Sequence, residues 1–86
     1  MKPIDVWKSH AHSVRVKEGR ISDLLTMFRS RKDRIGVLYN DLITNHPNSI
    51  TYKTFQRLIA EMAERQIIKA TKQVGAQGNT TMITFP

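Results

Sequence analysis

The sequence predicts a small α+β domain in which three helices are followed by a two-stranded β-hairpin. Three patterns support this prediction: apolar stripes at helical spacing, a later change to two-residue alternation, and the turn sequence "GAQGN" between the alternating segments. A chain of 86 residues has room for one hydrophobic core. We therefore divide it into an N-terminal basic arm, residues 1–19, and one folded domain, residues 20–86.

The apolar stripes define three helices and most of the core. They are Ile21, Leu24, Leu25 and Phe28; then Ile35, Leu38, Tyr39, Leu42 and Ile43; then Phe55, Leu58, Ile59 and Met62. Pro47 ends the second helix, because proline disfavours helical geometry in the residue before it. Ser49 and Thr51 are candidate caps for the third helix. We expect burial of Phe28, Leu38, Leu42, Phe55, Leu58, Ile59 and Met62.

The segment after Gln66 has the period of a β-hairpin. Residues 67–74 alternate between two sides and contain several β-branched side chains. "GAQGN" supplies turn residues that tolerate a positive φ, and "TTMITF" provides the second strand. The helical stripes and the strands together can close one small core, which disfavours the alternative of unrelated elements.

The arm is the least patterned part of the chain. Single hydrophobic residues are spread among basic ones, and no helical stripe is visible. We interpret the arm as partly ordered, with "SVRV" at residues 13–16 as a candidate short strand and Trp7 as a candidate docking residue. Its basic residues are Lys2, Lys8, Arg15 and Lys17.

Charge is the strongest feature of the composition. The 14 Lys and Arg residues outnumber the 7 Asp and Glu residues, which gives a formal net charge of +7. Such an excess predicts attraction to phosphate polyanions or to anionic membrane, with an ordinary basic surface as the alternative. The basic residues do not line one long amphipathic face, so we expect no membrane binding.

Cysteine usage and hydropathy indicate the compartment. The chain has no cysteine, which excludes a disulfide framework and a thiolate metal site. No apolar run reaches the ~20 residues that span a bilayer, and the N-terminus lacks an apolar block of signal-peptide length. We therefore expect a soluble, cytoplasmic protein.

With these elements in place, the phrase "ITYKTFQRLIAEMAERQIIKA" resembles the segment of winged-helix domains in which the recognition helix runs into the first wing strand. The resemblance to this helix-turn-helix superfamily covers residues 20–86 and implies DNA binding, commonly in transcription regulation. A weaker resemblance links "LYNDLITNHPNSITYKTFQRLIAEMAERQIIKA" to the C-terminal winged helix of archaeal origin-recognition initiators. The chain contains no "GxxxxGKS/T" loop, so only their DNA-contacting module carries over.

The resemblance implies that the third helix lies in the major groove of double-stranded DNA and that the hairpin contacts the adjacent backbone or the minor groove. At ~100° per residue, the helix face opposite the apolar stripe is basic in its first half and acidic in its second. Predicted base contacts are Lys53, Gln56 and Arg57, with Arg57 suited to guanine and Gln56 to adenine. Predicted backbone contacts are Tyr52, Thr54, Arg31, Lys32, Arg34, Lys69 and Lys72, and predicted wing-tip residues are Gln73, Gln77 and Asn79.

Several alternatives stay open on the sequence. If the third helix does not contact DNA, it is an ordinary solvated amphipathic helix. In the same way, "RSRKDR" can be a solvated helix end and "GAQGN" a simple turn. The main functional alternative is a winged-helix protein–protein interaction module in a replication, transcription or segregation complex. Lys53, Arg57 and the net charge favour DNA, and RNA is disfavoured because no aromatic stacking platform is visible. A homodimer through the arm with Trp7, or through the first helix, is a candidate assembly.

No catalytic arrangement is evident. His10 and His12 have a spacing that suits a metal on a strand, but the sequence offers no third ligand. The acidic residues are scattered, without a paired-carboxylate or Ser–His–acid pattern. We therefore predict a DNA-binding protein that is not an enzyme, needs no metal, cofactor or small-molecule substrate, and associates with the nucleoid when bound to DNA.

Overall fold

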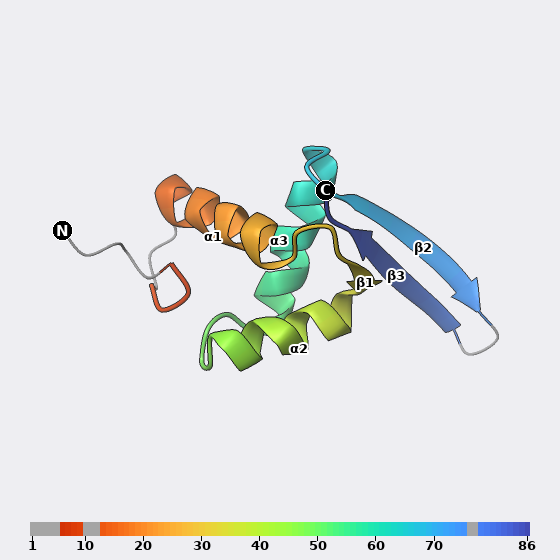
Figure 1. Cartoon of the computed structure of the whole chain (residues 1–86), viewed down its shortest axis with the longest axis horizontal. Coiled ribbons are helices and arrows are strands. Elements are labelled where there is room, and N and C mark those ends of the chain that lie inside the picture. Colours follow the sequence, from red (N-terminus) through yellow and green to blue (C-terminus); the bar gives the residue numbers. More distant parts are fainter. Residues whose placement is uncertain (1–5, 10–12, 76–77) are drawn as a thin grey trace.

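The computed structural model describes residues 6–9, 13–75 and 78–86. Within these residues the chain forms three helices and one three-stranded antiparallel sheet (Figure 1). The helices pack together, and the hairpin formed by the last two strands extends away from them. The predicted α+β class is confirmed. In chain order the elements are α1 (Val14–Met27), β1 (Lys32–Arg34), α2 (Ile35–Asn45), α3 (Tyr52–Glu64), β2 (Lys69–Gly75) and β3 (Gly78–Thr84).

Helix α1 begins earlier in the chain than the sequence predicts. The side chain of Ser13 accepts a hydrogen bond from the backbone N–H of Val16 at 3.1 Å and caps the helix. Val16 is buried, whereas Val14 is 73% exposed. The prediction of a strand at residues 13–16 is therefore wrong. A capping serine and one buried valine outweigh the β-propensity of the two valines.

Strand β1 is an addition to the predicted two-stranded hairpin. It pairs with β3, which becomes the central strand of the order β1–β3–β2. Hydrogen bonds from Phe85 N to Arg31 O and from Ser30 N to Pro86 O, both 2.8 Å, continue this connection. Three residues are too few to show a two-residue period, so the sequence pattern does not reveal the strand. The cross-strand pairs are Lys32–Thr84, Asp33–Ile83 and Arg34–Met82.

The connection between α2 and α3 is short and well bonded. Helix α2 ends before Pro47, as predicted. Of the two candidate caps, Thr51 is the N-cap of α3: its hydroxyl accepts from the backbone N–H of Thr54 at 3.2 Å, and the two hydroxyl oxygens lie 3.0 Å apart. The hydroxyl of Tyr39 donates to the carbonyl of Ile50 at 2.9 Å. These bonds fix the start of α3 relative to α2.

The helices and the sheet share one core. Each of the seven residues expected to be buried is at most 7% exposed, whereas Ile43, at the end of the second stripe, is 36% exposed. Phe28 and Phe85 meet edge to face, with ring centroids 5.4 Å apart, and join the end of α1 to the end of β3. Trp7 belongs to the core although it lies in the predicted arm. Further members of the core are Ile21, Leu24, Ile50, Ile68 and Ile83.

Leu58→Ala tests the central position of α3 in this core. Leu58 is 7% exposed, so its truncation removes apolar contacts and leaves a cavity. We expect the free energy of unfolding to fall by about 2–5 kcal/mol in urea denaturation followed by circular dichroism. Val14→Ala, at an exposed position, is the control and should change it by less than about 0.5 kcal/mol. Equal losses in the two variants would contradict the assigned core.

Candidate nucleic-acid interface

Helix α3 presents a polar face to solvent. Its buried stripe consists of Phe55, Leu58, Ile59 and Met62. The first half of the opposite face has no carboxylate. The face is therefore positively charged where the helix begins and acidic only near its end. Its exposed residues are Lys53, Gln56, Arg57, Ala60 and Glu64.

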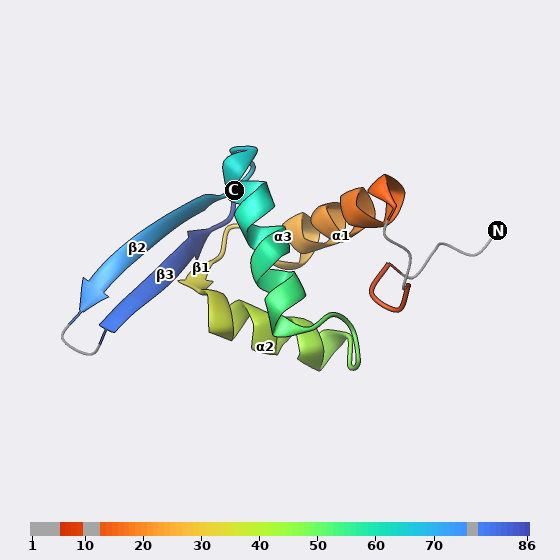
Figure 2. The same ribbon diagram turned by 180° about the vertical axis from the view of Figure 1, so that it is seen from behind.

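Two surface hollows lie along the sides of this face. The hairpin-side groove, about 610 Å³, is lined by Arg34, Asn40, Tyr52, Gln56, Thr80 and Thr81, among others. The α1-side groove, about 640 Å³, is lined by residues that include Ser13, Lys17, Thr54, Arg57 and Glu61. In Figure 2, α3 accordingly lies between the β2–β3 hairpin and α1. The side chains of Gln56 and Arg57 therefore lie on different sides of the helix, with Gln56 in the hairpin-side groove and Arg57 in the α1-side groove.

The acidic groups around α3 are mostly paired. Glu61 of α3 lies 3.0 Å from Lys17 of α1, and Glu18 of α1 lies 2.7 Å from Arg65, which follows α3. The hydrogen bond to Glu18 raises the pKa of Arg65. Among the carboxylates of the described residues, only that of Glu64 has no hydrogen bond or ion pair. The ion pairs thus join α1 to α3 and partly neutralise the acidic second half of α3.

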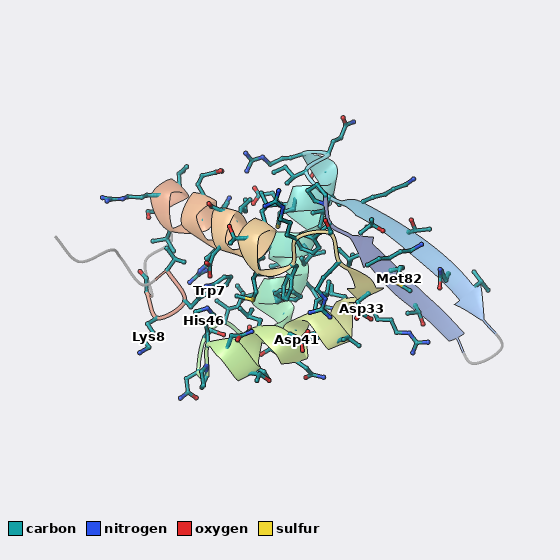
Figure 3. The ribbon with its side chains drawn as sticks, in the orientation of Figure 1. Trp7, Lys8, Asp33, Asp41, His46 and Met82 are labelled. Carbon is teal, nitrogen blue, oxygen red and sulfur yellow. The ribbon has the colours of Figure 1, made fainter. Side chains whose placement is uncertain are left out.

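Arg31 differs from the other predicted cationic contacts. Its guanidinium donates to Asp41 and, at 3.1 Å, to Asp33, and it lies 5.5 Å from the ring centroid of Phe28. Figure 3 labels both aspartates, which lie on α2 and β1. The hydrogen bond to Asp41 raises the pKa of Arg31. Because these carboxylates compensate its charge, we assign Arg31 a structural role, in which it joins α1, β1 and α2, in place of a DNA contact. The predicted cationic contacts that are exposed and form no ion pair with a described residue are Lys32, Arg34, Lys53, Arg57, Lys69 and Lys72.

The sheet register divides the lysines of the sheet between two faces. Lys32 and Lys69 lie opposite the same residue of β3, whereas Lys72 lies opposite Thr81. Because side chains alternate along a strand, Lys72 shares the face of the buried Ile83, and the other two lysines lie on the reverse face. Thr81 also lines the hairpin-side groove. Lys72 is therefore on the same side of the sheet as this groove.

Two of the three predicted wing-tip residues lie on the strands of the β2–β3 hairpin, near its turn. Gln73 is exposed on β2, and Asn79 lies on β3. Gln77, like His10 and His12, lies outside the described residues. In the part of the chain that the structure describes, no group of three or more His, Cys, Asp or Glu residues could hold a metal ion.

Three polar residues that complete the hairpin-side groove are not among those that the sequence predicts. Asn40 belongs to α2, and Thr80 and Thr81 belong to β3, yet all three border the start of α3. The sequence pattern that could have indicated Thr81 is the alternation of side chains along β3, which places Thr81 on the same face as Ile83. That signal becomes usable only when the register of the strands is known.

Comparisons with protein-family models, with curated protein sequences and with solved structures gave no match to this chain. No helix within the described ranges is long and apolar enough to cross a membrane. Function is therefore inferred from the residues and geometry of the α3 face and its two grooves.

A double-mutant cycle measures the interaction between Arg31 and Asp41. Their side chains are 35% and 41% exposed, so solvent screens the pair and we expect a coupling energy of about 0.5–1 kcal/mol. Urea denaturation of the wild type, Arg31→Ala, Asp41→Ala and the double variant gives the value. The same cycle with Arg34→Ala is the control and should give a coupling near zero, because Arg34 forms no ion pair with Asp41. Absence of coupling between Arg31 and Asp41 would show that the pair does not form in solution.

Proposed function

We propose that this chain is a winged-helix protein that binds double-stranded DNA. In this proposal α3 lies in the major groove, and the β2–β3 hairpin, as the wing, contacts the adjacent backbone or the minor groove. The observation that carries the proposal is the exposed first half of α3, where Lys53, Gln56 and Arg57 occur together without a carboxylate. Regulation of transcription is the role that the resemblance implies.

Base contacts are assigned to side chains on the face opposite the core stripe. The guanidinium of Arg57 matches O6 and N7 of guanine in a bidentate geometry, and the amide of Gln56 matches adenine in the same way. These two residues border different grooves beside α3, so we assign them to different base pairs. Lys53 lies in the first turn of α3 and is the third residue within reach of base edges.

Backbone contacts are assigned to residues around the hairpin-side groove. Arg34 immediately precedes α2, Tyr52 begins α3, and Lys72 lies on the helix-facing side of the hairpin. Contacts from such residues to phosphates fix the position of a protein on DNA without selecting a sequence. Lys32 and Lys69 lie on the reverse face of the sheet and, unlike Arg34, do not line the hairpin-side groove, so we assign them to the long-range positive field instead.

The exposed surface of α3 favours DNA over a protein partner. The centre of a protein-docking surface is enriched in aromatic and other apolar side chains and depleted of charged ones. Only one of the large hydrophobic residues exposed in the described ranges lies on α3, namely Tyr52 at 39%. The others are Val14, Val37, Ile43 and Val74. The cationic first half of α3 therefore supports a polyanion as the partner.

The salt dependence of DNA binding tests this proposal. If Arg34 and Lys72 each neutralise one phosphate, these two contacts contribute about −1.8 to the slope of log K against log salt, because each neutralised phosphate contributes about −0.9. Titration of a labelled duplex at several salt concentrations measures the slope. A slope near zero, or no binding in dilute salt, would remove the DNA proposal. Capture of a specific protein by a chain without DNA affinity would favour the interaction module.

Two further variants separate sequence reading from backbone binding. Arg57→Ala should lose discrimination at one base pair by about 1–3 kcal/mol, because a bidentate contact to guanine disappears. Lys72→Ala should weaken binding to all sequences alike and reduce the salt slope by about 0.9. Competition binding with a randomised duplex library measures both effects. If Lys72→Ala lost its preference among DNA sequences while Arg57→Ala kept it, the hairpin would be the element that recognises the base sequence. The proposed orientation of the protein on DNA would then be wrong.

A further inference from the structure

The N-terminal segment 6–9 is held against the helices through Trp7. This residue is 3% exposed, and its indole N–H donates to Asp23 of α1 at 2.5 Å. Its ring lies 5.7 Å from that of His46, whose Nε2 is 3.5 Å from the same Asp23 carboxylate. Figure 3 shows Trp7 and His46 side by side between α1 and the end of α2. Trp7 therefore anchors the segment to both helices.

Helix α1 also fixes the backbone of this segment. The guanidinium of Arg20 donates from Nε to the carbonyl of Val6 at 2.8 Å and from Nη2 to the carbonyl of Ser9 at 3.0 Å. Gly19 permits the close approach, because a Cβ at this position would lie 2.6 Å from Cγ1 of Val6. The segment is thus bonded to α1 at both of its ends and anchored by Trp7 between them.

Lys8 is the exposed residue of the anchored segment. It points away from the helices in Figure 3, and it forms no ion pair with a described residue. Together with Thr51 and Thr54, it borders an open hollow at the N-terminal end of α3. In Figure 2 the hairpin and this segment lie on opposite sides of α3. The fold therefore holds a cation beside the first turn of α3, away from the hairpin.

We propose that segment 6–9 is a third DNA-contacting element, in which Trp7 is a positioning residue and Lys8 binds a phosphate of the duplex backbone. This inference rests on the proposed function and extends it, since the hairpin and Lys8 then bind the backbone on opposite sides of α3. A compact ammonium group suits a phosphate better than a bidentate base edge. The segment is ordered before DNA arrives, so Lys8 binds without the entropy loss of fixing a flexible arm.

Two matched charge variants of the full chain test the role of Lys8. Lys8→Ala and Arg15→Ala each remove one exposed cation that forms no ion pair with a described residue. At ~100° per residue, Arg15 points directly away from the buried Leu24, and it does not line the α1-side groove. Both variants are titrated with a random-sequence duplex at several salt concentrations. We expect Lys8→Ala to bind roughly eightfold more weakly at 0.1 M salt with a slope reduced by about 0.9, and Arg15→Ala to match the wild type.

A second pair of variants tests the anchor. In a Trp7→Ala background, Lys8→Ala is expected to change the affinity less than it does in the wild type, because Lys8 is no longer held in place. Circular dichroism verifies that the helices persist. Should Trp7→Ala fail to fold, Gly19→Leu takes its place, since a side chain there displaces Val6 and keeps both Trp7 and Lys8.

The outcomes distinguish this inference from the proposed function. Unchanged binding by Lys8→Ala, or an equal loss in Arg15→Ala, overturns the inference and leaves the proposed function standing. If Lys8→Ala weakens DNA binding as much in the Trp7→Ala or Gly19→Leu background as in the wild type, the positioning role of Trp7 is overturned. If the wild type binds no duplex even in dilute salt, the proposed function and this inference fail together.

Discussion

The pairing of β1 with β3 is the constraint on which the geometry of the candidate interface depends. Strand β1 runs into α2 without a linker, because Arg34 ends the strand and Ile35 begins the helix. Its partner β3 is also the second strand of the hairpin. The short β1–β3 ladder therefore sets the position of the hairpin relative to α2. The hydrogen bond from Tyr39 of α2 to the carbonyl of Ile50 in turn sets the position of α3 relative to α2. The hairpin-side groove lies where these elements meet, since Arg34, Tyr39 and Thr81 all line it.

Ion pairs compensate some of the positive charges of this small basic chain and leave others uncompensated. Lys17, Arg31 and Arg65 are bonded to carboxylates that join one element to another. Such pairs contribute little stability each when they are exposed, so their larger effect is on the charge that the surface presents. The carboxylates they occupy lie on α1, α2, β1 and the second half of α3. Positive charge is left uncompensated at the start of α3, at Lys53 and Arg57.

Features that depend on near neighbours in the chain are predictable from this sequence, and features that depend on distant ones are not. The helical stripes, the Thr51 cap and the hairpin are local patterns, as is the exposed face of α3. Strand β1 is not local, because its three residues are defined by a partner near the C-terminus. Within "RSRKDR", Arg31 and Arg34 look alike until the fold brings Asp41 beside one of them. The placement of Lys32 and Lys72 on opposite faces likewise requires the register of β3.

The burial of Trp7 couples the stability of the domain to the surface it presents. A domain of this size buries a limited share of its chain, so covering the space between α1 and the end of α2 with a large indole is a substantial gain in apolar burial. The same burial removes freedom from the residues on either side, and Arg20 removes more by binding two backbone carbonyls. Folding thereby holds the backbone at Lys8 in place. An N-terminal segment that completes the core for this reason also contributes Lys8 to the molecular surface beside α3.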